Sequence, residues 1–107
     1  MQYLDFENNN LSELPREIDT LIYLTFFSLG GNYIKIIPVE IGKLSSLENL
    51  GLEDNPISTM PETIMDCFNL TTLNLNGTNI SAIEKRLLEF WVSGHQNQSF
   101  GIWVEGD

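Results

Sequence analysis

The apolar residues of this chain recur with a period of 23. In the stretch from Leu47 to Ile64, "LENLGLEDNPISTMPETI", they stand at positions 47, 50, 52, 57, 60 and 64. This spacing matches neither an amphipathic helix, with apolar residues three and four apart, nor a strand, with alternate apolar residues. Because related spacings occur one period earlier and one period later, the pattern indicates a repeat rather than one regular element.

Four units of the repeat follow one another without an insertion, beginning at Met1, Leu24, Leu47 and Leu70. Seven positions of the unit are apolar in all four, which at 42% apolar content would occur by chance roughly once in 10^10 to 10^11. We call one such position, followed through the four units, a column, and the seven columns predict the core. Ile83 is the fourth-unit residue of the fifth column. The columns begin at Met1, Leu4, Phe6, Leu11, Leu14, Ile18 and Leu21.

Two polar or special positions keep the same period. Proline stands at positions 15, 38 and 61, where its fixed φ suits the start of a short helical or extended segment. Asparagine stands at positions 9, 32 and 55, and Thr78 takes the fourth place. Both positions therefore belong to the repeated unit.

The pattern L-x-x-L-x-L-x-x-N-x-L-x-x-L-P-x-x-I-x-x-L resembles the 23-residue class of leucine-rich repeat proteins. The resemblance covers residues 1 to about 83, with a weaker continuation to Phe90. It implies an α/β repeat fold, a solenoid forming a short horseshoe arc. A parallel sheet would line the concave side, and short helical or irregular segments the convex side. It also implies a structural asparagine ladder of Asn9, Asn32 and Asn55, whose amides satisfy buried backbone groups of neighbouring turns.

We expect residues 1–83 to form the repeats and residues 84–107 a C-terminal cap of one helix and one strand. Glu84 replaces the proline, and "SAIEKRLLEFW" is typical of an amphipathic helix with Ser81 and Glu84 at capping-box spacing. Further on, Phe100, Ile102 and Val104 alternate as in a strand. This tail would cover the last turn. An exposed aromatic partner site and the start of a further domain are the alternatives.

The N-terminal end has no such cap, because Met1 already occupies the first apolar column. The apolar side chains of the first unit would lack a neighbour on one side, and the strand near Leu4 would have an open edge. Three explanations remain. The chain is part of a longer array, the first turn is loose, or the edge pairs with another molecule, which includes self-association.

The net charge of the chain limits the classes of partner that it is expected to bind. Fifteen acidic residues against five basic ones give a net charge of −10, whereas nucleic acids and anionic membranes need a basic footprint. A protein partner, and a basic one in particular, is favoured, unless the acidity only maintains solubility. The sequence has no signal peptide and no apolar run long enough to cross a membrane, and Cys67 is the only cysteine. We therefore expect a cytoplasmic protein, with an exported bacterial effector as an open alternative.

No motif predicts catalysis, a cofactor or a metal site. His95 stands in a polar segment with no nucleophile placed by motif, and Cys67 occupies an apolar column. Zinc-ligand spacing, the twelve-residue calcium loop and the lysine of a phosphate-binding loop are absent from the sequence. We expect the protein not to be an enzyme.

The repeat columns on the solvent side of the strands and just past them predict the partner-binding residues. Aromatic anchors beside carboxylates suit a basic or mixed polar partner, although a plain solvated surface is the alternative. Four short strands give a face well below the about 800 Å² of a standard interface, so binding through it alone would be weak. The expected contacts are Tyr3, Asp5, Glu7, Phe26, Tyr33, Glu53 and Asp54.

The leading hypothesis is a non-enzymatic protein-protein interaction module that binds a partner through the concave face. The alternative is a structural or regulatory fragment of a larger multidomain leucine-rich repeat protein, whose effector domain lies elsewhere.

Overall fold

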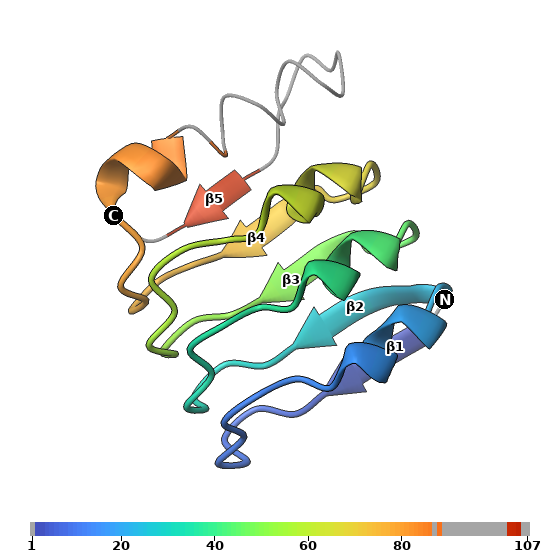
Figure 1. Ribbon diagram of the computed structural model, residues 1–107, viewed down its shortest axis with the longest axis horizontal. Helices are drawn as coiled ribbons and strands as arrows, with labels where there is room; N and C mark the ends of the chain where they lie inside the picture. The colour runs from blue at the N-terminus through green and yellow to red at the C-terminus, as the bar shows by residue number, and fades with distance from the viewer. Residues whose placement is uncertain (1, 87, 89–102, 106–107) are drawn as a thin grey trace.

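The computed structural model describes residues 2–86, 88 and 103–105, the last three by their backbone. Five parallel strands form one sheet in chain order, as Figure 1 shows. The solenoid and its parallel sheet, which the repeat predicts, are confirmed. The strands are β1 (Gln2–Asp5), β2 (Leu24–Ser28), β3 (Asn49–Gly51), β4 (Thr72–Asn74) and β5 (Trp103–Glu105).

The register of the sheet reproduces the period of the sequence. Leu4 pairs with Phe27, Phe27 with Leu50, Leu50 with Leu73, and Leu73 with Val104. Residues that occupy the same position in successive units therefore lie side by side across the sheet. One 23-residue unit makes one turn of the solenoid. Strand β5 lies beside β4 as an additional parallel strand, in the region where alternation predicts one, while Phe100 and Ile102 lie outside the described residues.

The return segments of the first three turns are short 3₁₀ helices, which lie beside one another in Figure 1. Each follows a proline with φ between −70° and −68°, and each buries one isoleucine. The residue after each helix donates its N–H to that isoleucine's carbonyl, at 2.9 to 3.1 Å. The fixed φ of proline thus starts each return. The helices are η1 (Arg16–Thr20), η2 (Val39–Lys43) and η3 (Glu62–Asp66).

The core is closed in the inner turns and open at the first. Leu29, Leu52 and Leu75, from one column, are fully buried, but Phe6 of the same column is 42% exposed. Ile18 of the first turn is buried, but four other apolar residues of this turn are only partly buried, because a solenoid turn needs a neighbour on each side to seal its core. These residues are Leu4, Leu11, Leu14 and Leu21.

The prediction that Ile83 lies in the core is wrong. Ile83 is 74% exposed, and Leu88 is buried at the end of the same unit. In the second and third turns the equivalent residues precede a proline in an extended segment, whereas residues 82–86 are α-helical. Because an α-helix turns its side chains by about 100° per residue, it directs position 83 away from the core. Leu87 and Phe90, the next predicted core residues, lie outside the described residues.

The hydrogen bonds of Glu84 also differ from those of the capping box that the spacing of Ser81 and Glu84 predicts. The Ser81 hydroxyl accepts the Glu84 N–H at 3.1 Å, as in a helix cap. The Glu84 carboxylate, however, accepts hydrogen bonds from the Thr59 hydroxyl and the Met60 N–H, both at 2.9 Å. The residue that replaces the repeat's proline therefore ties the helix to the third turn.

Asn32 connects the first two turns through hydrogen bonds inside the bend. Its side-chain oxygen accepts the N–H groups of Asn9 and Leu11, both at 2.9 Å. Its amide donates to the carbonyls of Phe6, at 3.0 Å, and of Leu29, at 2.8 Å. With a longer contact of 3.3 Å to the Gly30 carbonyl, one buried side chain thus bonds five backbone groups of two successive turns.

Asn55 repeats this arrangement one turn later. Its oxygen accepts the Ile34 N–H at 3.0 Å, and its amide donates to Leu29 at 2.9 Å and to Leu52 at 3.2 Å. Asn9, in contrast, is exposed, and its amide donates to the carbonyl of Glu7 in its own turn. The three asparagines therefore share a position but not an environment.

We predict that Asn32→Ala lowers the free energy of unfolding by roughly 3 kcal/mol, because it leaves several buried backbone groups without partners. Asn9→Ala is the matched control, with an expected loss of less than about 1 kcal/mol because its amide is exposed. Urea unfolding followed by circular dichroism would measure both. Equal losses in the two variants would contradict the structural role of the buried amide.

Candidate partner-binding surface

Two aromatic rings stack on the outward side of the sheet. Tyr3 of β1 is paired in register with Phe26 of β2, and their ring centroids are 4.2 Å apart at an angle of 5°. Tyr3 is 59% exposed, and Phe26 is half-buried. The same row continues with the polar residues Asn49 and Thr72. The pair therefore forms a flat aromatic platform at the β1 side of the sheet.

Asp5 lies two residues after Tyr3 on the same face of β1. It is exposed, and one carboxylate oxygen accepts the Glu7 N–H at 3.1 Å. In the fourth turn the amide oxygen of Asn74 accepts the Asn76 N–H in the same way, at 3.0 Å. Asp5 thus has a local role in the turn after its strand and still presents its charge to solvent.

Glu53 folds back over the strand ends. Its carboxyl carbon lies 2.6 Å from the place that a Cβ would take on Gly30, and its Oε1 lies 2.9 Å from that place on Gly51. Ser28 is next to Gly51 in the sheet. The two glycines therefore create the shallow space in which this carboxylate lies.

The same carboxylate has an unsatisfied atom. Oε1 of Glu53 is buried and has no hydrogen-bond partner among the described residues, although the side chain as a whole is only half-buried. An unsatisfied buried acceptor costs stability, and it needs a reason to be kept. A donor supplied by a partner is one such reason.

Asp54 belongs to a column whose backbone conformation the sequence analysis did not predict. Asn8, Gly31, Asp54 and Gly77, which occupy the same position in successive units, all have positive φ, between 56° and 73°. The Asp54 carboxylate lies against the Cα of Gly77, as the Asn8 amide lies against Gly31. Asp54 is therefore engaged with the next turn as well as exposed to solvent.

A signal for this column was present in the sequence. Asparagine, glycine and aspartate are the residues that adopt left-handed backbone conformations most readily. Their recurrence at one position of every unit indicates a left-handed residue in the bend of each turn.

The two remaining predicted contacts lie in loops. Glu7 is exposed in the loop after β1. Tyr33 is 61% exposed in the loop after β2, where its N–H donates to the Leu11 carbonyl at 2.7 Å. The structure thus places Tyr3, Asp5 and Phe26 on strands and the other four residues beyond the strand ends. Of those four, Glu53 reaches back onto the sheet.

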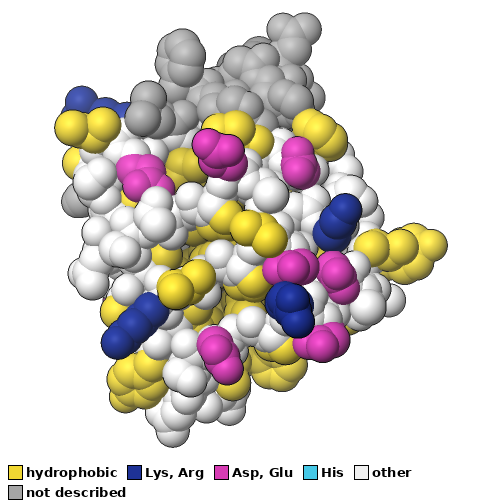
Figure 2. Space-filling view, viewed as in Figure 1, with side chains coloured by type: hydrophobic (Ala, Val, Ile, Leu, Met, Phe, Trp, Pro, Cys, Tyr) yellow, Lys and Arg dark blue, Asp and Glu magenta, His cyan; other side chains and the backbone are white. Residues whose placement is uncertain are grey.

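The face that Figure 2 shows has a mixed character. Acidic side chains are spread over it, with basic and apolar ones between them. Within the described ranges, no group of three or more His, Cys, Asp or Glu residues is placed to hold a metal ion. None of the helices described has the length and apolar character that a membrane crossing requires.

Cys67, the one thiol, lies in the core. It is 1% exposed, and its Sγ donates to the Ile41 carbonyl at 3.3 Å. Burial raises the pKa of the Cys67 thiol from 9.0 to about 12, and the negative charge of Asp66 adds to the effect. A neutral, enclosed thiol serves as a small apolar core residue.

Comparisons with known proteins agree with this architecture. The family model described as "Leucine Rich Repeat" matches residues 1–21. A plant intracellular Ras-group-related LRR protein 7 from Oryza sativa subsp. japonica is 39% identical over 44 residues, which are 41% of this chain and 17% of that protein.

Solved structures extend the similarity over nearly the whole chain. A leucine-rich repeat protein of Leptospira interrogans superposes with a TM-score of 0.86 at 30% identity, covering 98% of this chain and 25% of its own. An internalin of Listeria monocytogenes shares the fold with a TM-score of 0.74 at 20% identity, over 98% of this chain and 30% of its own.

The chain consists of leucine-rich repeats and has the leucine-rich repeat fold. It spans between 17% and 30% of the length of these relatives. Proteins of this family are in general protein-protein interaction modules.

The shifted pKa of Cys67 gives a testable pH dependence. Because the folded state holds the thiol neutral, its contribution to stability is complete below the unfolded pKa of 9.0 and is lost as the pH rises toward about 12. Between about pH 8 and pH 10, the wild type should lose roughly 1 kcal/mol more than Cys67→Ala. Chemical unfolding at the two pH values measures this. The two proteins share every other residue, so their other pH effects cancel, and parallel losses would contradict the prediction.

Proposed function

We propose that this chain is a non-enzymatic module that binds a basic segment of a protein partner on the outward, concave side of its sheet. The observation that carries the proposal is the Glu53 carboxylate, held over two glycines with a buried oxygen that no described residue satisfies. Charge-assisted hydrogen bonds from an arginine or lysine are the strongest way to complete such a group.

The neighbouring residues favour a cationic side chain. Ser28 pairs with Asp5 on one side and with Gly51 on the other, so small residues separate the Asp5 and Glu53 carboxylates. A long basic side chain fits such a shallow surface between two acids. The net charge of −10 would attract a basic partner from a distance and speed its association.

The aromatic platform supplies the apolar part of the contact. Phe26 and Ser28 stand two residues apart on β2, so their side chains share one face. The aliphatic stem of an arginine or lysine could lie against Tyr3 and Phe26, and its cation could face a ring or a carboxylate. Aromatic residues of this kind dominate the energetics of many interfaces.

The small size of the sheet sets the expected affinity. Strands of three to five residues make a face smaller than a standard interface, so we expect weak binding, with a dissociation constant of the order of micromolar. A larger protein that contains this chain would add contacts. The alternative is therefore a structural or regulatory role within such a protein. This alternative is supported by the short length of the chain, which covers 17% and 25% of two of its relatives.

We predict that a photo-crosslinking phenylalanine analogue crosslinks the protein partner when it replaces Tyr3. The same analogue in place of Tyr23 should not crosslink this partner. Tyr23 is the matched control, because it is a tyrosine of similar exposure, 67% against 59%, outside the proposed surface. Capture should weaken about tenfold with Glu53→Gln or Phe26→Ala, and with added salt. Equal capture at both positions, unaffected by these substitutions, would contradict concave-face binding.

Glu53→Gln tests the same residue in a second way. The substitution keeps the shape of the side chain over Gly30 and Gly51 but removes the charge. The melting temperature should stay the same or rise, because the buried oxygen has no partner to lose. Glu62→Gln, at an exposed carboxylate on η3, is the control for charge removal. A marked fall in melting temperature would assign Glu53 a structural role instead.

A further inference from the structure

Two large apolar side chains of the second turn face solvent on the return side of the coil. Ile36 is 76% exposed and Val39 is 60% exposed, and they lie on either side of Pro38. The first turn has Glu13 and Arg16 at the same two positions of the unit, so polar residues suit both places. Scattered exposed apolar residues are ordinary, but this pair departs from the repeat within an inner turn.

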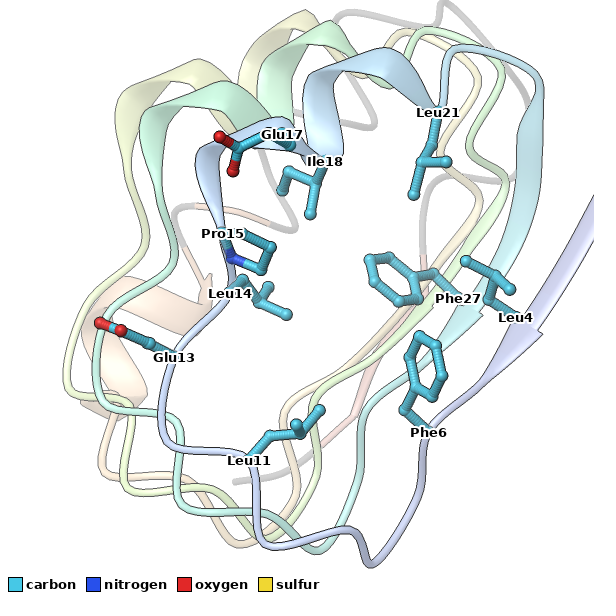
Figure 3. A pocket seen from close by; sticks show the side chains of 10 residues that line it. All are labelled: Leu4, Phe6, Leu11, Glu13, Leu14, Pro15, Glu17, Ile18, Leu21 and Phe27. Atoms are coloured by element: carbon cyan, nitrogen blue, oxygen red, sulfur yellow. The ribbon is translucent and has the colours of Figure 1, made fainter.

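The return face, as we call it, is the solvent side of residues 12–20, 35–43, 58–66 and 81–86. Figure 1 shows η1, η2 and η3 in front of the strands, and Figure 3 shows the Glu13 carboxylate pointing outward from this part of the coil. In Figure 2 apolar side chains gather near the middle of the face, with charged ones around them. The face spans the two longer dimensions of the molecule, 37 and 29 Å, and is therefore on the order of 1,000 Å², enough for a standard interface of about 800 Å² per partner.

The charges of the return face alternate from turn to turn. All five basic residues of the chain lie in its four segments. The first segment has three acids and one base, the second has one acid and two bases, and the third has two acids and no base. The fourth has two bases and Glu84, whose carboxylate is bonded to Thr59 and Met60. A partner of a single sign would therefore meet like charge in some of the turns.

A second copy of the chain carries the matching pattern of charge. We consider a two-fold axis in the plane of the face, parallel to the return segments and between the second and third turns. This axis sets turn two of each copy over turn three of the other, and turn one over turn four, so that each acidic turn faces a basic one. Lys43 and Asp66, both exposed, occupy the same position in successive units, so each lysine lies over the aspartate of the other copy.

The same arrangement covers the exposed apolar pair. A hollow of about 170 Å³ lies beside η3, and a cavity of about 150 Å³ can hold a benzene molecule, so the hollow accepts one aliphatic side chain. Ile36 and Val39 correspond to Thr59 and Glu62 of the third turn, and the residues between those two line the hollow. Setting turn two over turn three therefore brings the pair over the hollow of the other copy, and burying it favours association. The apolar lining is Met60, Pro61, Ile64, Met65 and Leu88.

We infer that the return face binds a second copy of the chain in a two-fold dimer, with the apolar pair of each copy at the hollow of the other and Lys43 opposite Asp66. Such a contact is isologous and closed, and it leaves both concave sides open to solvent. The inference therefore does not depend on the proposed concave-face function. The net charge of −10 on each copy opposes association at long range, so the dimer should be reversible and should form as the concentration rises.

A charge exchange at one position of the repeat tests the arrangement. Lys43→Asp and Asp66→Lys each introduce a residue that the repeat already has at this position in a neighbouring turn, so folding should survive. Sedimentation equilibrium of the wild-type chain should show monomers and dimers, and each single variant should weaken dimerisation by about tenfold or more. An equal mixture of the two variants should restore it to within about threefold of the wild type, because only the mixed dimer pairs opposite charges at both places.

Glu48→Lys is the matched control. It makes the same change of charge as Asp66→Lys, at an exposed residue just before β3 and outside the return face. Because it lowers the net negative charge, it should not weaken the dimer, whereas Asp66→Lys should. Ile36→Thr tests the apolar pair separately, since the third turn has threonine at this position, and it should weaken the dimer about tenfold with an unchanged circular dichroism spectrum.

A wild-type chain that stays monomeric at millimolar concentration would overturn the inference. A dimer that the mixed variants do not restore would overturn it as well, because another face would then make the contact. Assemblies that keep growing with concentration would also contradict an isologous contact. A photo-crosslinker in place of Val39 should capture an isotope-labelled second copy, and capture of a different protein instead would assign the face to that partner and overturn the dimer.

Discussion

The repeated architecture of this structure depends on one constraint, which is that a turn of the coil cannot satisfy its own buried backbone. The bend after each strand turns inward, where water cannot reach, and its N–H and carbonyl groups need partners. Asn32 and Asn55 supply them with one amide each, and each amide contacts two successive turns. The turns are thereby held at the spacing at which their leucines pack. The apolar rows and the parallel strands then follow with a single period.

The same constraint explains why the ends differ from the middle. A turn with neighbours on both sides buries its apolar rows completely, as Leu29 and Leu52 do. The first turn has a neighbour on one side in this structure, so Phe6 stays partly exposed and β1 keeps an open edge. At the other end the repeat changes chemistry, and Glu84 replaces a proline and ties a helix to the third turn.

The residues of the proposed surface depart from the repeat, because the repeated residues are used for packing. Glu53 shows the difference clearly, since its neighbours Leu52 and Asn55 are buried and satisfied while one of its own oxygens is not. The glycines beneath it are small enough to admit the carboxylate. Likewise, Tyr3 and Phe26 make an aromatic row that changes to polar residues in the next two strands.

The sequence by itself determined the turn length, the apolar rows, the prolines that start the 3₁₀ helices and the buried positions of Asn32 and Asn55. The sequence determines these features because they depend on the spacing of residues along the chain, which can be read directly from the sequence. Only the tertiary structure decided that Ile83 faces solvent, that Tyr3 stacks on Phe26, and that Glu53 reaches back over two glycines. Those outcomes depend on side-chain direction and on the gap left by residues of neighbouring turns. A helix in place of an extended segment rotates a side chain, and a missing Cβ opens space for another. Neither effect follows from a column of the repeat.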